Sequence, residues 1–392
     1  MRICFVSEPL FPITGTSSRT LCLAKALAKA GHEVFVVAFK ECYSAPPVED
    51  FNRVKIVRLD EIVPVRFYRE RVKNYLNLVL SGRIIPVLLK LVKILRELQP
   101  DVVHCANYFS SLMGISIKGL IESPVVADLH ASARLESMFR GDYVLCLYAA
   151  VLEQTICRLA DGVITPTSAF KNYLVKTYRI SDTSKIEVVP NCIEIDEFRP
   201  RFSREEVRAK IGVGAEDLVI FFHGSPYPEN LRALAFIAFL LEKLNKSGIN
   251  VKALVAGRFE NIGIRSPYIV YLGYVEDLPT YMNAADLAVL PVFSVSLGIR
   301  SRILEYMACG LPVVTLRKAV LGMEYLLNHD CILAVDNLDD FFPTLVELLS
   351  RIRKSKTPDK SVRELVLTYF SPERIVNKLE NFYAYVLSKS WR

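Results

Sequence analysis

Residues 1–38 read MRICFVSEPLFPITGTSSRTLCLAKALAKAGHEVFVVA, and this stretch contains the unit from which the rest of the fold is predicted. A short apolar run, Ile3–Val6, is followed by a turn-rich loop and then by a helical stretch, Arg19–Ala30. Gly31 ends that helix, and a second apolar run follows at Val34–Ala38. A strand, a loop, a helix, a glycine stop and another strand, in this order, predict a βα unit that leads into the next strand.

The same alternation recurs along the 392 residues. Apolar runs predict further strands at 54–58, 102–105, 125–129 and 162–165, and a second series at 186–189, 219–222, 251–256, 269–272, 287–290 and 312–315. Helices are expected at 84–98, 230–244, 278–284, 302–309 and 372–388. Strands buried on both faces and separated by helices form parallel sheets. The predicted fold is therefore α/β, with two doubly wound Rossmann-like domains that face each other across a cleft.

A polar stretch at 181–185 is the predicted boundary between the two domains. Residues 1–182 would form the first domain and residues 183–371 the second. The C-terminal helix, within 372–392, is expected to pack back on the first domain. Ligands of such sheets bind beyond the carboxyl ends of the strands, so the loops that follow strands are where chemistry is sought.

The composition points to a folded, basic chain. Hydrophobic residues make up 52% and charged residues 23%, a balance that excludes a disordered chain. The net charge is +7, and residues 1–182 hold 23 basic and 17 acidic residues, so nearly all of the surplus lies there. A basic, apolar chain predicts a negatively charged partner such as a membrane surface.

One segment, 66–96, concentrates this charge, with eight basic residues and one acidic residue. Its second half, Ile84–Leu98, is best explained as a core helix with a solvated stripe, whereas Arg66–Leu80 favours a surface for a membrane or a lipid-linked acceptor. Nucleic acid is not expected, because no nucleic-acid motif accompanies the charge. The stretch Val144–Leu159 is apolar but short and interrupted by charge, so we expect a buried helix. The first residues do not resemble a secretory signal, which predicts a cytoplasmic protein, peripheral on the inner face of the membrane.

The nine cysteines are scattered, and none forms a C-x-x-C pair. Several lie inside apolar runs, as Cys4, Cys105 and Cys157 do. This distribution predicts reduced cysteines in the core, and neither a zinc site nor a disulfide framework.

Two loops of the first domain carry candidate residues. Gly15 lies in the loop after the first strand, where a small residue lets backbone N–H groups approach an anion at a helix start. His104 and His130 each end an apolar strand, a position that faces the mouth of a cleft. The alternative is an ordinary βα turn for Gly15 and hydrogen-bonded structural histidines for the other two.

The stretch Ser294–Gly310, SVSLGIRSRILEYMACG, is the most informative of the second domain. Gly298 lies in a loop, and Arg300 and Arg302 stand at the next helix start, a combination that favours a diphosphate site. Glu305 lies three residues after Arg302, so it forms either a surface ion pair with it or a contact with ribose or sugar hydroxyls. A phosphorylated protein ligand would suit the same groups. In FFHGSPYPENLRAL, Gly224 ends a strand and Asn230 is expected to cap a helix from Leu231.

Taken together, these segments resemble the retaining glycosyltransferases of family 4, which have the GT-B fold. The similarity runs nearly end to end, through the opening 37 residues from Arg2, ADGVITPTSAFKNYLV, KIEVVPNCIEIDEFRP, HGSPYPENLRAL, GYVEDLPTYMNAADLAVLP and GIRSRILEYMACGLPVVT. The resemblance implies that residues 1–182 bind the acceptor and residues 183–371 bind a nucleotide-sugar donor, UDP- or GDP-linked. It also implies metal independence and no cofactor.

The resemblance further implies roles for single residues. Those at the donor phosphates would be Gly15, Gly224, Gly298, Ile299, Arg300 and Arg302, with Glu305 holding the ribose, and Tyr274 and Val275 contacting the base. His130 would border the sugar near its anomeric carbon. The chain departs from the usual pattern at Leu297, where many members have Glu, and at Gly15–Thr16, where two glycines are usual. Only Arg232 lies near the position where members carry an Arg and a Lys.

The expected reaction is retaining transfer of a hexose-type sugar to a hydroxyl of a glycan or lipid-linked acceptor. Negative charge develops on the leaving diphosphate, where Arg300, Arg302 and a helix start would stabilise it. A phosphate oxygen can accept the proton of the acceptor, so no protein base is assigned and His130 is expected to position the sugar. The alternatives are a nucleotide-sugar 2-epimerase and a catalytically weak nucleotide-binding homologue.

Overall fold

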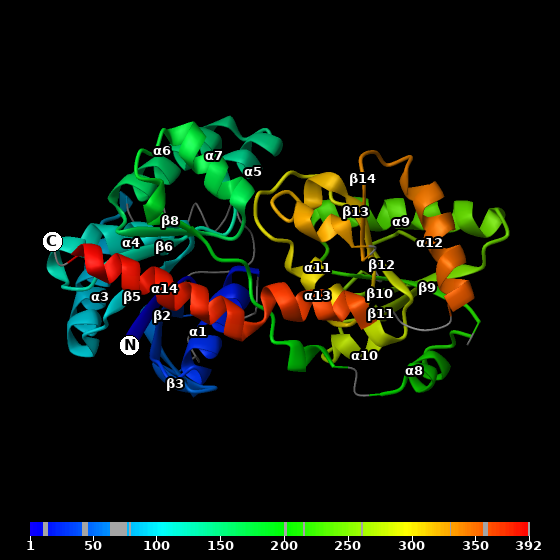
Figure 1. The fold of residues 1–392 in the computed structure, drawn as a ribbon, viewed down its shortest axis with the longest axis horizontal. Coiled ribbons are helices and arrows are strands. Elements are labelled where there is room, and N and C mark those ends of the chain that lie inside the picture. Colours follow the sequence, from blue (N-terminus) through cyan, green and yellow to red (C-terminus); the bar gives the residue numbers. More distant parts are fainter. Residues whose placement is uncertain are drawn as a thin grey trace. The chain divides into compact units, whose positions relative to one another are not determined.

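The computed structural model describes residues 1–10, 15–40, 46–62, 77, 80–199, 202–214, 216–259, 262–329, 331–355 and 360–390. The chain forms two α/β units, which are described separately below (Figure 1). The first unit comprises Met1–Cys192, Leu297–Ile299 and Pro372–Arg392, and the second comprises Ile193–Ser296 and Arg300–Ser371. The predicted Arg66–Leu80 surface lies almost wholly outside the described residues.

The first unit is built on a sheet of eight strands within the described chain, in the order β3-β4-β2-β1-β5-β6-β7-β8. All neighbouring strands run parallel except β3 and β4, which form an antiparallel pair at one edge. The strands are β1 (Arg2–Ser7), β2 (Glu33–Lys40), β3 (Val48–Phe51), β4 (Val54–Ile62), β5 (Val102–Ala106), β6 (Val125–Asp128), β7 (Gly162–Thr165) and β8 (Ile186–Val188).

The last of these strands corrects one expectation. The apolar run at 186–189 was predicted to open the second sheet, but β8 pairs with β7 and closes the first sheet. The polar stretch before it forms a short 3-10 turn, Thr183–Lys185, that returns the chain alongside β7. A run of three or four apolar residues does not indicate which sheet it joins, because strand pairing is decided by distant contacts.

Helices cover both faces of this sheet, which explains why strand β1 is apolar almost throughout. Ile3 and Phe5 pack into one core with residues of α1 (Gly15–Lys29) and α14 (Pro372–Ser390). Cys4 and Val6 point to the other core, which includes residues of α3 (Ile84–Leu98) and α4 (Asn107–Ile117). Because successive side chains of a strand point to opposite faces, a strand buried on both sides cannot alternate with polar residues. The remaining helices of the unit are α5 (Ala133–Phe139), α6 (Tyr143–Leu159) and α7 (Ser168–Tyr178).

The C-terminal helix α14 is part of the first unit. It packs against α1, and its Phe382 and Val386 lie so close to Gly162 at the start of β7 that a Cβ there would be 2.8 Å from the Phe382 ring. Helix α3 also fits its expectation as a core helix, since Val87, Leu91, Val92 and Leu95 form its buried face.

The second unit repeats the architecture with a sheet in the order β11-β10-β9-β12-β13-β14, whose paired strands are all parallel. The strands are β9 (Leu218–His223), β10 (Val251–Ala256), β11 (Ile269–Gly273), β12 (Leu287–Leu290), β13 (Val313–Leu316) and β14 (Ile332–Val335). The helices are α8 (Arg204–Lys210), α9 (Pro228–Lys246), α10 (Leu278–Asn283), α11 (Ser301–Ala308), α12 (Phe341–Ser355) and α13 (Lys360–Phe370). The predicted class, two doubly wound α/β domains, is confirmed.

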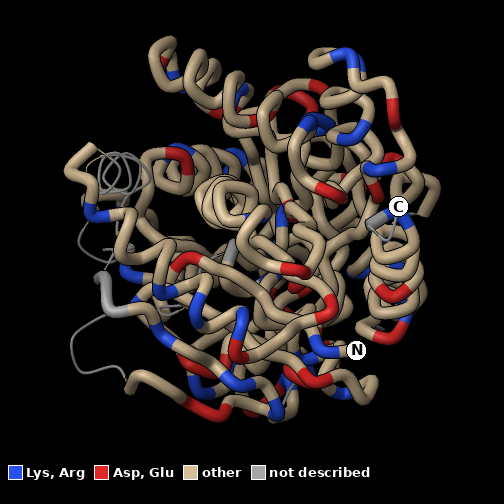
Figure 2. The backbone as a smooth tube through the Cα atoms, turned by 90° about the vertical axis from the view of Figure 1, so that its left-hand side faces the viewer, with Lys and Arg blue, Asp and Glu red and all other residues tan. Residues whose placement is uncertain are grey.

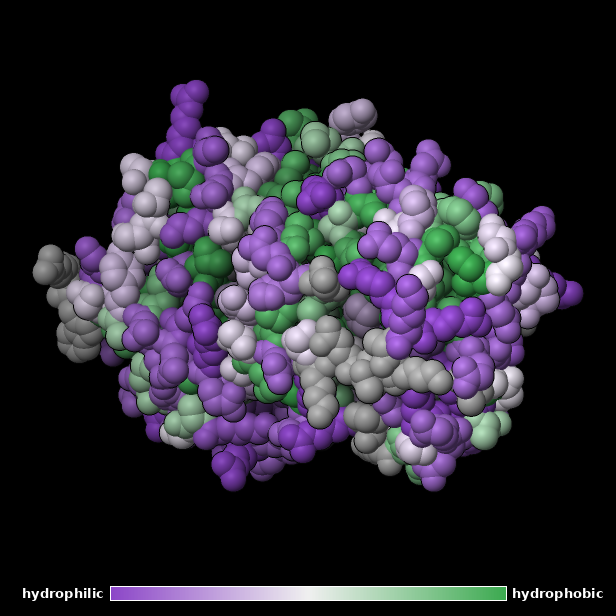
Figure 3. Space-filling model, turned by 45° about the vertical axis from the view of Figure 1, so that its right-hand side comes forward, coloured by the Kyte–Doolittle hydropathy of each residue, from purple (hydrophilic) through white to green (hydrophobic). Residues whose placement is uncertain are grey.

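Basic and acidic residues are interspersed along the described backbone (Figure 2). On the face drawn in Figure 3, hydrophilic side chains surround smaller apolar areas. Within the described chain, no helix is both long and apolar enough to cross a bilayer.

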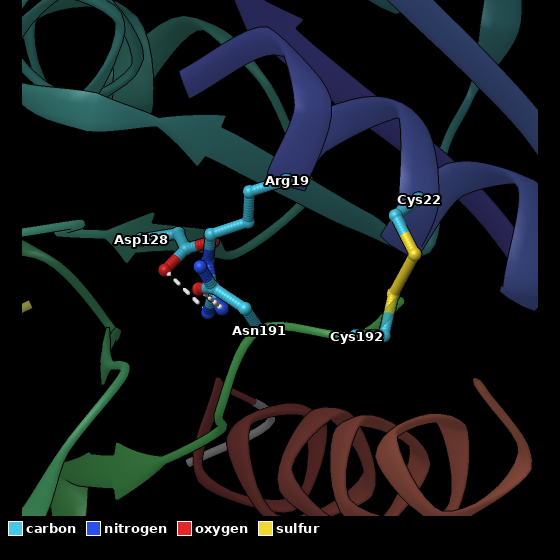
Figure 4. Close-up of a disulfide and its surroundings, with 5 residues drawn as sticks. All are labelled: Arg19, Cys22, Asp128, Asn191 and Cys192. Carbon is cyan, nitrogen blue, oxygen red and sulfur yellow. Dashed lines mark hydrogen bonds and ion pairs between the residues drawn. A yellow bond between two sulfur atoms is a disulfide. The ribbon is translucent and has the colours of Figure 1, made fainter. Parts of the chain in front are cut away.

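The cysteines follow their expectation only in part. Cys4, Cys105 and Cys157 are buried free thiols, and burial raises the pKa of the Cys4 and Cys157 thiols to about 12. Such thiols stay protonated and unreactive. Cys22 on α1 and Cys192, however, form a disulfide (Figure 4), so the expectation of reduced cysteines is wrong for this pair. The two residues are 170 positions apart, which is why their spacing carries no signal.

This disulfide closes a long loop, and its removal should lower stability. The chain-entropy account gives roughly 5 kcal/mol for loops beyond 100 residues. We expect Cys22→Ser to lower the melting temperature by roughly 10 °C or more, and a reductant to do the same to the wild type but not to the variant. Differential scanning calorimetry measures both.

Cys146→Ser is the matched control, because Cys146 is a half-buried free thiol of the same unit. Identical melting temperatures for the wild type, with and without reductant, would contradict the prediction.

Candidate functional site

The topology of the second sheet brings two candidate loops together. Strand β9 lies between β10 and β12. From β9 the chain continues to β10 and β11 on one side, and it then returns to add β12, β13 and β14 on the other. The loops that follow β9 and β12 therefore flank the point where strand order reverses, which is where doubly wound sheets bind ligands. The first loop carries Gly224, and the second leads through Ser294 to Arg300 and into α11.

Arg302, in the first turn of α11, joins these two loops. Its Nη1 donates to the carbonyl oxygen of His223 at 2.8 Å, and its Nη2 donates to Oδ1 of Asn230 at 3.0 Å. Asn230 in turn donates through Nδ2 to the carbonyl oxygen of Ser225 at 2.8 Å. A guanidinium group presents several donors in a fixed plane, so it can hold the loop and still present charge to an anion.

Gly224 lies directly beside these side chains. A Cβ at this position would be 2.8 Å from Nδ2 of Asn230 and 3.2 Å from Nη1 of Arg302. Gly257, which has a positive φ of 120°, approaches from the other side, and a Cβ there would lie 2.0 Å from the carbonyl oxygen of Gly224. Gly257 requires glycine, because a Cβ there would meet backbone, whereas a Cβ at Gly224 would displace the side chains of Asn230 and Arg302. The structure thus brings two of the predicted residues, Gly224 and Arg302, together.

Asn230 does not have its predicted place. The expected helix start was Leu231 with Asn230 as its cap, but α9 begins at Pro228 and Tyr227 occupies the capping position. A proline favours the first helical position, because its φ is fixed and its missing N–H would have no helical partner there. Asn230 is consequently inside the first turn, where its side chain faces the Gly224 loop.

Glu305 does not form the surface pair with Arg302 that was one of its two interpretations. Its Oε2 lies 3.1 Å from Nε2 of His223, and both side chains are largely buried. Tyr306 completes the arrangement, since the backbone N–H of His223 donates to its hydroxyl at 3.2 Å. Two residues of α11 therefore hold His223 by hydrogen bonds to its carbonyl oxygen and its N–H, and a third, Glu305, lies beside its ring. Sequence reasoning gave His223 no role.

Arg300 belongs to a second contact group, on the loop before α11. Its Nη2 donates to Oγ and to the carbonyl oxygen of Ser294 at 3.0 and 3.3 Å. Glu229 accepts from the backbone N–H groups of Phe293 and Ser294 and, at 2.7 Å, from the Ser294 hydroxyl. Burial would raise the pKa of Glu229, but these hydrogen bonds and the charge of Arg300 lower it below its usual value. Glu229 was missed because an acidic residue in a first helical turn is common for helix stability alone.

Tyr274 and Val275 follow β11, two strands away from β9. Tyr274 is 70% exposed, and the Arg258 guanidinium carbon lies 5.8 Å from its ring centroid. The two residues are on the same carboxyl edge as Gly224, with β10 between.

In the first unit, Gly15 is the first residue of α1 and His130 lies two residues beyond the end of β6. The group that holds this edge is a buried ion pair that sequence reasoning did not single out. Arg19 of α1 binds Asp128 of β6 in a bidentate pair, Nε–Oδ2 at 2.8 Å and Nη2–Oδ1 at 3.0 Å (Figure 4). Both side chains are 1% exposed. Arg19 also donates to Oδ1 of Asn191 and to the carbonyl oxygen of Val189, each at 2.8 Å.

The two histidines singled out in the sequence both approach Asp128, in different settings. His104 is fully buried, with Nε2 at 3.3 Å from Oδ2 of Asp128 and Nδ1 at 2.7 Å from the Tyr383 hydroxyl of α14. It is therefore a structural histidine, and its expected place at a cleft mouth is wrong. His130 is 15% exposed in its side chain, and its Nε2 lies 3.5 Å from the same Oδ2.

Burial and the charge of Arg19 determine the protonation states of Asp128 and His104. Burial alone would raise the pKa of Asp128, but the Arg19 charge, the neighbouring His130 ring and the hydrogen bond from His104 hold it well below its usual value. Burial lowers the pKa of His104, so its ring is neutral. Since a carboxylate can only accept, the His104 proton lies on Nε2 and Nδ1 accepts from Tyr383.

The segment Leu297–Ile299 packs with the first unit. The Thr167 hydroxyl donates to the carbonyl oxygen of Leu297 at 2.5 Å. A Cβ on Gly298 would lie 2.2 Å from the carbonyl oxygen of His130, so only glycine fits. Gly298 and His130, two predicted site residues, are therefore neighbours.

These features define a class of protein. Two doubly wound parallel sheets, each with polar groups at the carboxyl edge, form the GT-B fold of glycosyltransferases. Among solved structures, sucrose-phosphate synthase from Thermosynechococcus elongatus matches with a TM-score of 0.79 at 16% identity, over 99% of this chain and 100% of that one. HepE of Anabaena, in complex with UDP-glucose, matches with a TM-score of 0.70 at 17% identity, over 99% and 100%.

The chain belongs to glycosyltransferase family 4, the group 1 glycosyl transferases. The model of Glycosyltransferase Family 4 matches residues 13–197, and that of Glycosyl transferases group 1 matches residues 217–351. An uncharacterized glycosyltransferase of Methanocaldococcus jannaschii is 26% identical over 79% of this chain and 77% of its own length. A D-inositol 3-phosphate glycosyltransferase of Mycobacterium sp. (strain KMS) is 30% identical over 64% of this chain, and the match spans 59% of that relative.

The Arg19–Asp128 pair predicts a specific effect on stability. Asp128→Asn leaves the buried arginine without its counter-charge, so the free energy of unfolding should fall by about 3–5 kcal/mol at neutral pH. Because the folded pKa of Asp128 is depressed, its contribution is present above its unfolded pKa, about 4, and is lost as the pH falls through the folded value. Urea unfolding at several pH values should therefore show the difference between variant and wild type shrinking in acid.

Glu33→Gln serves as the control, because Glu33 pairs with Arg2 at 2.7 Å on the surface of the same unit. An exposed pair is worth less than about 1 kcal/mol. Equal effects of the two variants at neutral pH would show that the buried pair does not organise the first unit.

Proposed function

We propose that the chain is a retaining hexosyltransferase. It would move a hexose-type sugar from a UDP- or GDP-sugar to a hydroxyl of a glycan or lipid-linked acceptor. The observation that carries the proposal is the group at the switch point of the second sheet, where Arg302, in the first turn of α11, lies against Gly224. Support also comes from HepE of Anabaena, a protein of the same fold that has been crystallised with UDP-glucose.

The chemistry of this group suits a leaving diphosphate. When the glycosidic bond to the donor phosphate breaks, negative charge grows on the phosphate oxygens. Arg302 is held by His223 and Asn230, so its charge is fixed before the reaction begins, and the start of α11 adds its positive dipole end. Fixed positive groups at the place where charge develops lower the barrier without reorganisation. Arg300, held by Ser294, is proposed to add a second charge.

The other predicted residues take supporting roles. Glu305 is proposed to hold the ribose hydroxyls beside His223, and Tyr274 and Val275 to contact the base. Gly15, Gly298 and Ile299 are proposed to offer backbone N–H groups to the phosphates. His130 would position the sugar, with its ring oriented by Asp128. The acceptor proton would go to a phosphate oxygen of the leaving group, so neither a protein base nor a metal is required.

The acceptor is proposed to be presented at an anionic membrane surface, where the enzyme binds peripherally. The excess of basic residues in 1–182 supports this part. The protein would then act where its lipid-linked acceptor resides.

The donor can be identified by ligand-induced stabilisation. Because a bound ligand stabilises the folded state by mass action, one of UDP-, GDP- or ADP-linked sugars should raise the melting temperature at concentrations above its Kd. We expect UDP- or GDP-sugars to do so, and product analysis by NMR should show the anomeric configuration retained. A melting temperature unchanged by every donor, or a product epimerised at C2, would contradict the proposal.

Removal of the Arg302 charge tests the mechanism. Arg302→Ala should lower kcat by roughly 100- to 1000-fold, with Arg302→Lys intermediate because lysine cannot reproduce the two bonds to His223 and Asn230. Arg317→Ala is the matched control, since Arg317 is a half-exposed arginine of the same unit that pairs with Asp336. Circular dichroism checks the fold of each variant. Unchanged turnover in a folded Arg302→Ala protein would exclude the assigned role.

A further inference from the structure

Helix α6 does not have the surroundings that its sequence predicts. Its first ten residues, YVLCLYAAVL from Tyr143 to Leu152, contain no charged residue, which led to the expectation of a buried helix. In the structure one face of this segment is open to solvent. Val144 is 81% exposed, Leu147 72% and Val151 62%.

These residues belong to a larger apolar surface, the α5–α6 ridge. Residues three and four positions apart lie on one helix face, so the exposed side chains of α6 form a continuous strip. The end of α5 extends the strip with two further exposed side chains. The ridge consists of Met138, Phe139, Tyr143, Val144, Leu147, Tyr148 and Val151.

The opposite face of α6 is firmly packed. Ala149, Glu153, Ile156 and Cys157 are buried, and Asp142 caps the helix by accepting from the N–H of Leu145. The fold of the first unit therefore orients this helix with its apolar strip outward. The seven side chains are between 37% and 81% exposed on two helices that pack against each other, and contiguous exposed apolar surface of this kind marks an interaction site.

The charges around the ridge indicate its occupant. Two exposed arginines flank the ridge: Arg140 at the C-terminal end of α5 and Arg158 in the last turn of α6. Of the neighbouring acidic groups, Asp142 caps α6 and Glu153 is buried, whereas Glu136 lies 4.0 Å from Arg140 in an i,i+4 pair. An apolar strip with cationic ends and tyrosines on it is the pattern of helices that lie in a membrane interface. A protein partner would require about one hydrogen bond per 100–200 Å², and the ridge offers only two tyrosine hydroxyls for this.

The ridge is also connected to the predicted acceptor side. Glu153, on the buried face of α6, accepts from the Ser132 hydroxyl at 2.9 Å and from the Arg134 N–H at 3.2 Å. Tyr108 donates to the Ala131 carbonyl oxygen at 2.6 Å and to Glu153 at 3.0 Å. The helix that carries the ridge therefore fixes the segment that follows His130.

We propose that the α5–α6 ridge inserts into the headgroup–acyl boundary of an anionic lipid bilayer, with Arg140 and Arg158 contacting lipid phosphates. This deepens the proposed function, because it names the surface by which the enzyme reaches a lipid-linked acceptor. Insertion buries side chains that folding leaves in water, and the arginines add attraction to the negative surface.

Vesicle co-sedimentation tests the proposal on the full-length chain. Vesicles of phosphatidylcholine with about 30 mol% phosphatidylglycerol should sediment the wild type, and Leu147→Glu should weaken this partition by about tenfold or more. Phe239→Glu is the matched control, since Phe239 is 58% exposed on α9 of the second unit and should leave binding unchanged. Arg140→Gln combined with Arg158→Gln should weaken binding to anionic vesicles and reduce its salt dependence.

Tryptophan emission reports insertion directly. The chain has one tryptophan, Trp391, so Leu147→Trp in a Trp391→Phe background places a single probe on the ridge. Its emission should shift to the blue on adding the vesicles, and that of Phe239→Trp in the same background should not. An unshifted spectrum, or equal loss of sedimentation in Leu147→Glu and Phe239→Glu, overturns the proposal. Lipid-independent self-association that Leu147→Glu abolishes would instead assign the ridge to a second copy of the chain.

The donor experiment separates this proposal from the proposed function. Leu147→Glu should keep the full donor-induced rise in melting temperature, because the ridge lies outside the donor group. Loss of vesicle binding with donor binding intact supports the ridge, and loss of both would show that the variant is misfolded, in which case the tryptophan measurement decides.

Discussion

The organisation of the first unit depends on one buried ion pair, Arg19–Asp128. Two charges taken out of water cost several kcal/mol each, and the cost is offset only when every donor and acceptor finds a partner. Here the partners come from α1, β6, the segment 189–191 and, through His104 and Tyr383, from β5 and α14. A displacement of α1, β6 or the segment 189–191 would leave a buried charge without a partner, and a displacement of α14 would leave the buried His104 without Tyr383. The pair therefore restricts the unit to one arrangement, and it does so directly beneath His130.

The second unit follows the same principle with different residues. Its carboxyl edge is held by α11, whose Arg302, Glu305 and Tyr306 all contact His223. In the second unit, Arg300 and Arg302, which are proposed to serve the donor, are already hydrogen-bonded to protein groups. Such preorganisation means that little reorientation has to accompany charge development in a reaction. The two edges differ in burial: Asp128 is sealed from solvent, whereas His223 and Glu305 keep part of their surface.

The sequence predicted those features that depend on local pattern. The alternation of apolar runs and helices identified both sheets. Arg302 was singled out by its place at a helix start and Gly224 by the family resemblance, and the structure brings these two residues together. Contacts between distant residues left no such signal. Arg19 and Asp128 are 109 positions apart and Cys22 and Cys192 are 170 apart, so neither pair was predicted. The exposure of α6 was also predicted wrongly. An apolar segment has the same sequence pattern whether or not another element covers it, so the pattern alone does not show burial.

The place of α14 has a consequence for the order in which the chain acquires its structure. The first unit takes its last helix from Pro372–Ser390, whereas every residue of the second unit precedes position 372. Tyr383 is synthesised 279 residues after the His104 that it contacts. The core around Ile3 and Phe5 includes side chains of α14, so it can be completed only after residues 372–390 have been synthesised, later than every residue of the second unit.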